Sequence, residues 1–151
     1  MLLSIRVYYE DTDAAGIVYY ANYMRFLERG RTELLRHLGH EQSALVTRQI
    51  AFAVRSVQAD YLKPAKLDDL IVVETVVDSI GRAQVMFAQQ VTRDGEPLLD
   101  AKIRIACIDP TRGKPVPMPR DIHQQLKALM DQPKTQPKAQ PKVQPKAELT
   151  E

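Results

Sequence analysis

The alternation of apolar and polar residues predicts one strand, one long helix and then four further strands. The first strand covers residues 3–9, and the others cover Ile50–Leu62, Leu70–Val77, Ala83–Thr92 and Leu99–Ile108. The last is the clearest, because its alternate positions Ala101, Ile103 and Ile105 are apolar and those between them are charged. A period of two is typical of a strand with one buried face. This element order predicts an α+β fold with a mostly antiparallel sheet.

A helix is predicted from Asn22 to Leu38, because apolar residues recur there at helical spacing. The apolar stripe consists of Tyr23, Phe26, Leu27, Leu34 and Leu38, and charged residues occupy the other side. Gly30 lies on the same stripe, where a missing side chain would let the helix backbone approach a sheet closely. That approach would offset the roughly 1 kcal/mol that glycine costs in helix propensity. Gly39 fits the position just past the helix C-terminus.

The sequence divides into a body and a tail. Residues 1–130 are long enough for one domain with an ordinary hydrophobic core, and they end in a short helix predicted over Pro119–Met130. Residues 131–151 contain a four-residue repeat of Gln-Pro-Lys plus one small or apolar residue. Because a proline at every fourth position disfavours both helix and sheet, we expect this tail to be disordered. An electrostatic tether to an acidic surface is the alternative role for it.

Composition excludes several classes of protein. The formal net charge of +2 divides into +1 for the tail and +1 for residues 1–130, which gives no basic footprint for nucleic acid. No apolar run approaches 18 residues, so no integral membrane segment is expected. The N-terminus is too short and too soon charged for a secretory signal. The single cysteine, Cys107, leaves no intrachain disulfide, and these features together predict a cytoplasmic protein.

Several common chemistries lack their residues. There is no Gly-x-Ser-x-Gly elbow and no phosphate-binding Gly-x-x-x-x-Gly-Lys loop. His37 and His40 have loose metal spacing without a neighbouring ligand, and a structural role at a helix C-terminus suits them better. The segment from Asp11 begins like a calcium loop, but Ala15 and Asn22 stand where oxygen ligands are required. We therefore expect neither a metal nor another cofactor.

An acidic segment between the first strand and the helix remains. Glu10, Asp11 and Asp13 are followed by Gly16 and by a cluster of tyrosines. A helix N-terminus offers unpaired N–H groups and a partial positive charge. A carboxylate beside those donors could attack a carbonyl carbon or activate water while the donors polarise the carbonyl oxygen. The residues alone leave open the simpler interpretation, in which Asp13 only caps a turn.

A longer motif bears on that choice. The stretch Arg-Val-Tyr-Tyr-Glu-Asp-Thr-Asp-Ala-Ala-Gly-Ile-Val-Tyr-Tyr-Ala-Asn-Tyr, from Arg6, followed by Phe-Leu-Glu-Arg-Gly-Arg-Thr-Glu, from Phe26, resembles the hydroxybenzoyl-CoA thioesterase family. It is most similar to the branch associated with the bacterial Tol–Pal cluster. The resemblance implies a hot-dog fold, in which a curved antiparallel sheet wraps a central helix. It also implies homodimers joined edge to edge, often paired into homotetramers, with the active site between subunits and acyl-CoA as substrate.

The resemblance also implies roles for individual residues. Asp13 matches the catalytic aspartate, acting as nucleophile or general base, and the backbone N–H near Tyr20 matches the group that polarises the thioester carbonyl. Gly16 would permit the tight turn that brings backbone close to substrate. Around the start of the helix, Tyr19, Asn22 and Tyr23 are expected to bind substrate. Many Tol–Pal-associated members have a histidine where this chain has Tyr20, so a side-chain role for that histidine is not carried over.

The CoA phosphates require cations. Arg55, Lys63 and Arg82 are the candidates by position, and a solvated surface charge is the alternative for each. Acyl carrier protein is an alternative carrier, because an acidic protein could dock on a basic rim or on the lysine-rich tail. A hot-dog protein that binds acyl groups or a cell-envelope partner without turnover is the non-enzymatic alternative.

Overall fold

Five long strands form one antiparallel sheet in the computed structural model, which describes residues 1–132. They are β1 (Leu2–Arg6), β2 (Ala51–Tyr61), β3 (Leu70–Ile80), β4 (Gln84–Arg93) and β5 (Glu96–Asp109), and a short β6 (Lys114–Pro115) pairs with β5. The order across the sheet is β1-β3-β4-β5-β2. Asp94 and Gly95, with φ of 50° and 78°, connect β4 to β5. Positive φ at both residues of a two-residue loop suits the twist of a hairpin.

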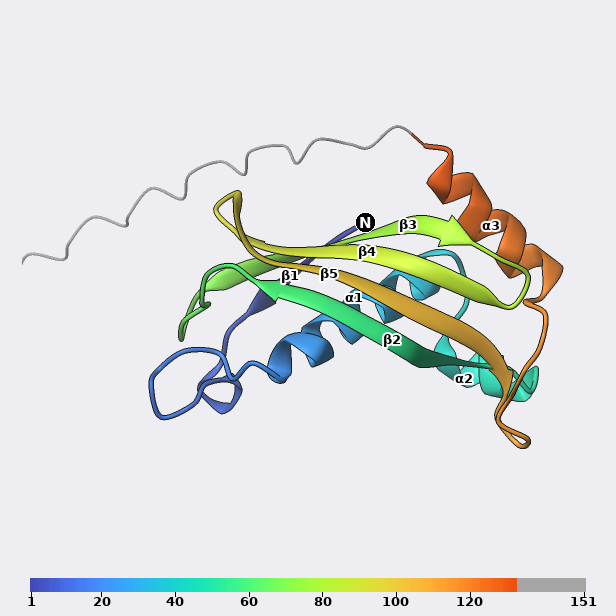
Figure 1. Cartoon of the computed structure of the whole chain (residues 1–151), viewed down its shortest axis with the longest axis horizontal. Coiled ribbons are helices and arrows are strands. Elements are labelled where there is room, and N and C mark those ends of the chain that lie inside the picture. Colours follow the sequence, from blue (N-terminus) through green and yellow to red (C-terminus); the bar gives the residue numbers. More distant parts are fainter. Residues whose placement is uncertain (133–151) are drawn as a thin grey trace, which may run out of the picture.

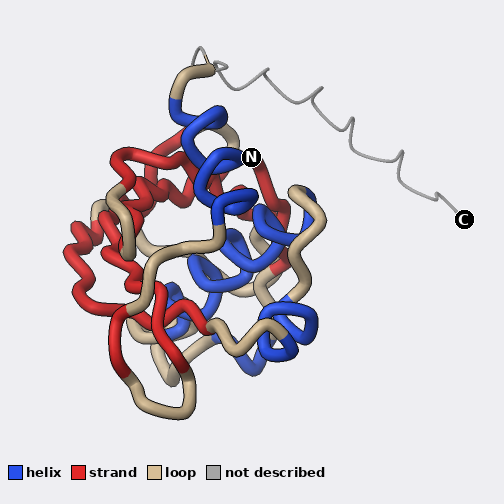
Figure 2. Tube along the Cα trace, turned by 90° about the vertical axis from the view of Figure 1, so that its right-hand side faces the viewer, coloured by secondary structure: helices blue, strands red, loops and turns tan. Residues whose placement is uncertain are grey.

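One long helix lies against the inner face of this sheet. It is α1 (Asn22–His37), and the strands curve past it in both views (Figures 1 and 2). A single turn η1 (Tyr9–Asp11) follows β1, a short α2 (Gln42–Thr47) follows α1, and α3 (Arg120–Met130) packs beside β3. The buried stripe of α1 includes Tyr23, Phe26, Leu27, Gly30 and Leu34. It packs on the apolar inner positions of β3, β4 and β5, which form the core of the molecule.

Gly30 marks the closest approach of α1 to the sheet. A Cβ atom at this position would lie 2.7 Å from Thr75 Oγ1 and 2.9 Å from Val73 Cγ1, so only glycine fits without displacement. Thr75 and Gln89 are the two buried polar side chains of the described chain. Gln89 Nε2 donates to Thr75 Oγ1 and to the Leu27 carbonyl oxygen, both at 2.9 Å. These bonds satisfy the buried amide and join helix to sheet.

The predicted α+β order and antiparallel sheet are confirmed, with local corrections, among them that β3 extends to Ile80 and β5 begins at Glu96. The first strand ends at Arg6 rather than residue 9, because Asp11 Oδ2 accepts the Tyr8 N–H at 2.8 Å and closes the η1 turn. Helix α2 was not predicted, since six residues are too few to display a helical period. The predicted helices over Asn22–Leu38 and Pro119–Met130 are present. Most of the predicted tail, residues 133–151, lies outside the described residues.

The C-terminal end of α1 meets the middle of α3 through side chains. His40 Nε2 contacts Gln125 Oε1, and Gln125 Nε2 donates to the Leu38 carbonyl oxygen at 3.1 Å. This agrees with a structural role for His40 at the helix C-terminus. No group of three or more His, Cys, Asp or Glu side chains within residues 1–132 is arranged to hold a metal ion. No helix in the same range is long and apolar enough to cross a membrane.

Candidate functional site

Asp13 lies in a tight loop between η1 and α1. Its N–H donates to the Ile17 carbonyl oxygen at 2.9 Å, and its own carbonyl oxygen accepts the Gly16 N–H at 3.0 Å. Gly16 has a φ of 77°, a conformation that glycine adopts without strain. An isolated β-bridge between Thr12 and Val18 closes the base of the loop. Gly16 therefore allows the chain to turn tightly beside Asp13.

The carboxylate of Asp13 is exposed to solvent, and only one of its two oxygens accepts a hydrogen bond from the described chain. Oδ1 accepts the Ala15 N–H at 2.8 Å, which is the turn-capping role left open by the sequence. No hydrogen bond within the described chain uses Oδ2. The turn therefore holds the side chain in place and leaves Oδ2 without a hydrogen-bond partner in the described chain. Asp13 can therefore cap the turn with Oδ1 and still offer Oδ2 for a reaction.

A second segment clamps the Asp13 loop to the body. The Val18 N–H donates to the Ala65 carbonyl oxygen at 2.8 Å, and Ile17 forms an isolated bridge with Lys66. The Ala65 N–H in turn donates to the Tyr23 hydroxyl oxygen at 2.9 Å. Tyr23 is 3% exposed, and burial raises the pKa of its hydroxyl. Tyr23 was predicted to bind substrate, whereas its hydroxyl is engaged in holding this clamp.

An ion pair lies behind the clamp. Arg93 Nη1 is 2.5 Å from Asp69 Oδ2 and 3.4 Å from the Pro64 carbonyl oxygen, and Asp69 Oδ2 also accepts the Lys66 N–H at 2.8 Å. Partial burial disfavours the Asp69 carboxylate, but the Lys66 N–H and the Arg93 guanidinium outweigh burial, so the pKa of Asp69 lies below its ordinary value. The segment from Pro64 to Lys66 is thus tied at both ends.

The start of α1 is tied to the Asp13 loop by one carbonyl group. The Asp11 carbonyl oxygen accepts the Tyr19 N–H at 3.0 Å and the Asn22 side-chain Nδ2 at 2.9 Å. Asn22 was predicted to bind substrate, and in the structure its amide also fixes the approach to the helix. No hydrogen bond of the described chain uses the backbone N–H of Tyr20. That donor, two residues before the first residue of α1, is available to a ligand.

Tyrosine side chains cluster around the backbone at Tyr20. The ring centroids of Tyr19 and Tyr20 are 4.8 Å apart, and Tyr61 of β2 lies 6.5 Å from Tyr20 and 5.5 Å from Tyr23. The Tyr61 hydroxyl donates to the Tyr20 carbonyl oxygen at 2.9 Å. Burial raises the pKa of Tyr61, and the neighbouring tyrosines add to the rise. Tyr61 was missed in the sequence, because only the fold brings β2 to the start of α1.

The three candidate cations for CoA lie apart from one another. Arg55 is exposed at the bulge that shifts the β2–β5 register, and the Lys63 ammonium pairs with the Glu96 carboxylate. Arg82 lies in the turn after β3, whose other end adjoins the clamp at Lys66. Eleven residues of strand separate these ends, a span of roughly 33 Å. Within one chain, Arg82 is therefore not brought to the Asp13 loop.

Comparison with known proteins decides the family. The model of the thioesterase-like superfamily matches residues 7–126. The chain belongs to this superfamily. It is 41% identical over 124 residues to the acyl-CoA thioester hydrolase YbgC of Escherichia coli O6:H1, which covers 82% of this chain and 92% of that protein. It is 45% identical over 119 residues to the acyl-CoA thioesterase YbgC of Haemophilus influenzae, covering 78% and 88%.

Solved structures agree with this membership of the thioesterase-like superfamily. A probable thioesterase from Bartonella henselae superposes with a TM-score of 0.76 and 33% identity, covering 79% of this chain and 98% of that one. The curved antiparallel sheet with a long central helix is thus a hot-dog fold. The resemblance identified from the Asp13 segment is confirmed, and so are the α+β hot-dog fold and the prediction of a thioester hydrolase.

Proposed function

We propose that this protein hydrolyses acyl-CoA thioesters to free acid and CoA, with Asp13 as the catalytic carboxylate. The observation that supports this assignment is the pairing of an unoccupied Asp13 Oδ2 with an unused Tyr20 N–H. The Asp11 carbonyl oxygen, two residues before Asp13, ties the two segments together by accepting the Tyr19 N–H and the Asn22 amide from the Tyr20 side. A fixed carboxylate and a fixed N–H donor are what attack on a thioester requires.

In this mechanism the Tyr20 N–H donates to the thioester carbonyl oxygen. Its position before α1 adds the partial positive charge of the helix N-terminus, which stabilises the developing oxyanion. Asp13 acts on the carbonyl carbon by one of two routes. As nucleophile it forms an acyl anhydride and expels the CoA thiolate, and water then releases the acid. As general base it removes a proton from water, which adds to the carbon before the C–S bond breaks.

The acyl group would lie against the tyrosine wall. Tyr19 and Tyr20 are 45% and 63% exposed, so both rings are available to a ligand. The hydroxyl groups of Tyr23 and Tyr61 are already engaged by the protein backbone. Of the residues predicted to contact substrate, Tyr19 and the ring of Tyr20 therefore fit that role best. Arg55 on the exposed strand remains a candidate for the CoA phosphates.

A homodimer formed through β2 completes the proposal. This strand ends the sheet, and on its open edge it has no partner within residues 1–132. Val54, Val57 and Tyr61 of β2 are 53%, 44% and 49% exposed, which is unusual for large side chains on a long edge strand. Pairing with a second β2 would cover them and place the partner beside Tyr61. Light scattering of the wild type and of Val57→Asp tests this, since the charge should favour monomers.

Thiol release measures the activity directly. The full-length protein is incubated with short, long and aromatic acyl-CoA substrates, and free CoA is followed with a thiol reagent. Cys107 is fully buried, so its thiol does not contribute to the signal of the folded protein. We expect enzyme-dependent CoA release from at least one substrate class. Binding of acyl-CoA without release would support a non-catalytic acyl-binding protein instead.

A further inference from the structure

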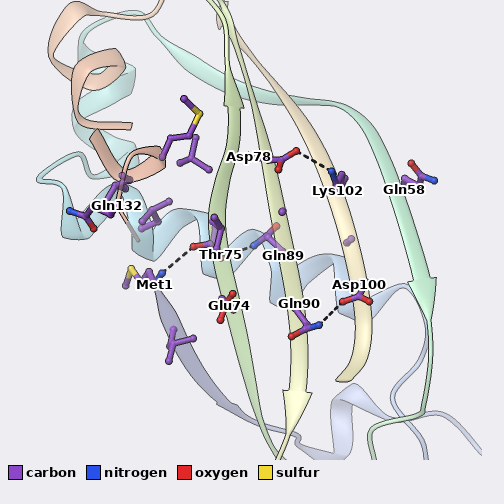
Figure 3. A pocket seen from close by; sticks show the side chains of 18 of the residues that line it. Met1, Gln58, Glu74, Thr75, Asp78, Gln89, Gln90, Asp100, Lys102 and Gln132 are labelled. Atoms are coloured by element: carbon purple, nitrogen blue, oxygen red, sulfur yellow. Dashed lines mark hydrogen bonds and ion pairs between the residues drawn. The ribbon is translucent and has the colours of Figure 1, made fainter. Parts of the chain in front are cut away.

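A groove of about 960 Å³ runs over the outer face of the sheet, and Leu34 and His37 of α1 and the end of α3 also line it. Four outward positions on neighbouring strands form one row across it, in the order Glu74, Gln90, Asp100 and Asp60, and each directly opposes the next. Figure 3 shows the first three projecting from the same face. The row therefore holds three carboxylates and one amide. Within residues 1–132, the end of α3 lies at the rim of this face.

The charge of this row is not balanced by the described chain. Asp60 and Asp100 oppose each other directly, an arrangement of like charges that destabilises a strand pair. The Lys102 ammonium and the Met1 ammonium both line the groove, but Lys102 turns to Asp78 at 3.1 Å and Met1 donates to the Thr75 carbonyl oxygen at 3.0 Å. Asp100 accepts only the Gln90 amide, at 2.7 Å. No salt bridge of the described residues includes Glu74, Asp60 or Asp100. A cationic occupant would relieve the repulsion.

The chain supplies such an occupant at the rim of the groove. Leu129, Met130 and Gln132 line its α3 side, and Gln132 is the last described residue. The sequence then continues with Lys134, Lys138, Lys142 and Lys146 at every fourth position, before any further acidic residue. Four neighbouring strands span about 14 Å, whereas the stretch 133–146 can reach about 45 Å when extended. Length and charge are both sufficient.

We propose that residues 133–146 bind across the outer face of their own sheet, with tail lysines on the Glu74, Asp100 and Asp60 carboxylates. Tethering at Gln132 keeps the lysines at high effective concentration near the row, so individually weak ion pairs suffice. A second copy of the sheet is the less suitable occupant, because it carries the same excess of carboxylates on this face. The inference rests on the outer face and the tail, and it is independent of the function assigned to Asp13.

Zero-length carbodiimide cross-linking of the full-length protein tests the proposal. The reagent joins a lysine ammonium to a carboxylate in contact with it, and mass spectrometry identifies the linked peptides. We expect links from the tail lysines to Glu74, Asp60 and Asp100, and a loss of these links at 1 M salt, where the screening length is about 3 Å. Mixing ¹⁴N and ¹⁵N protein distinguishes links within a chain from links between chains.

Variants make the test specific. Asp60→Asn with Asp100→Asn keeps side-chain shape and should reduce the links to Glu74 about fivefold, as the loss of two weak ion pairs predicts. The matched control, Glu10→Gln with Glu28→Gln, removes two exposed carboxylates that do not belong to the row. It should leave the links to Glu74 unchanged. If the tail lysines instead cross-link equally to carboxylates all over the surface, the proposal is overturned. Links mainly between chains would overturn it too and assign the face to a second copy.

Discussion

The Asp69 carboxylate and the Arg93 guanidinium, 2.5 Å apart, hold the segment that clamps the Asp13 loop. Arg93 reaches the Pro64 carbonyl oxygen, Asp69 accepts the Lys66 N–H, and Ala65 between them binds Val18 and Tyr23. An ion pair more than 20 residues apart in sequence thus supports the loop that presents Asp13. The carboxylate is positioned by contacts well outside its own motif.

Removal of Arg93 should therefore weaken both stability and activity. Arg93→Met leaves Asp69 without its cation and should lower the free energy of unfolding by about 1–2 kcal/mol. It should also lower kcat, because the clamp at Ala65 loosens. Urea unfolding and steady-state thiol release measure the two effects. The control is Arg36→Met, which breaks ion pairs on exposed side chains and should cost under about 1 kcal/mol. Equal effects of the two variants would argue against a special role for the clamp.

The same pair predicts a dependence of stability on pH. The pKa of Asp69 is lower in the folded protein than its ordinary value, so the folded state favours the carboxylate. Its stabilising contribution is full above the ordinary aspartate pKa near 4 and is lost as pH falls through the lower folded value. Thermal unfolding from pH 6 to pH 3 should show a smaller decline for Asp69→Asn than for the wild type. Parallel curves would contradict this prediction.

Tyr61→Phe should separate catalysis from folding. The change removes only the hydroxyl that donates to the Tyr20 carbonyl oxygen and keeps the ring among its aromatic neighbours. Loss of one hydrogen bond at the start of α1 should lower kcat about two- to tenfold, with a smaller change in KM. Tyr8→Phe is the control, since Tyr8 is 60% exposed. If both variants keep the wild-type kcat, Tyr61 does not position the Tyr20 backbone.

The elements with a sustained pattern could be predicted from the sequence. The apolar stripe of α1, the close approach at Gly30 and the alternation along β5 each express a local period that the fold preserves. The length of the motif around Asp13 also indicated the family. Strand β1 ended early because a side chain, Asp11, competes for the Tyr8 N–H. That competition depends on a turn and leaves no period in the sequence.

The supporting residues of the site could not be predicted in the same way. Tyr61 and Tyr20 are 41 positions apart, and Asp69 and Arg93 are 24 apart. Such contacts follow from strand register and sheet curvature, which the alternation of residue types does not specify. For the same reason Asn22 and Tyr23 were expected to contact substrate, although their polar groups bind Asp11 and Ala65. Residue type indicated where a candidate site lies, and the fold determined which of its polar groups have no hydrogen-bond partner in the described chain.

Asp13→Asn is the most direct test of the catalytic assignment. The asparagine side-chain oxygen can still accept the Ala15 N–H, so the loop and the folded state should persist in circular dichroism and thermal unfolding. A carboxylate that attacks or activates water is absent, so CoA release should fall at least about 10²–10⁴-fold in kcat. Asp94→Asn, in the β4–β5 turn, should retain wild-type turnover. Hydrolysis by a folded Asp13→Asn variant at the wild-type rate would contradict the proposed mechanism.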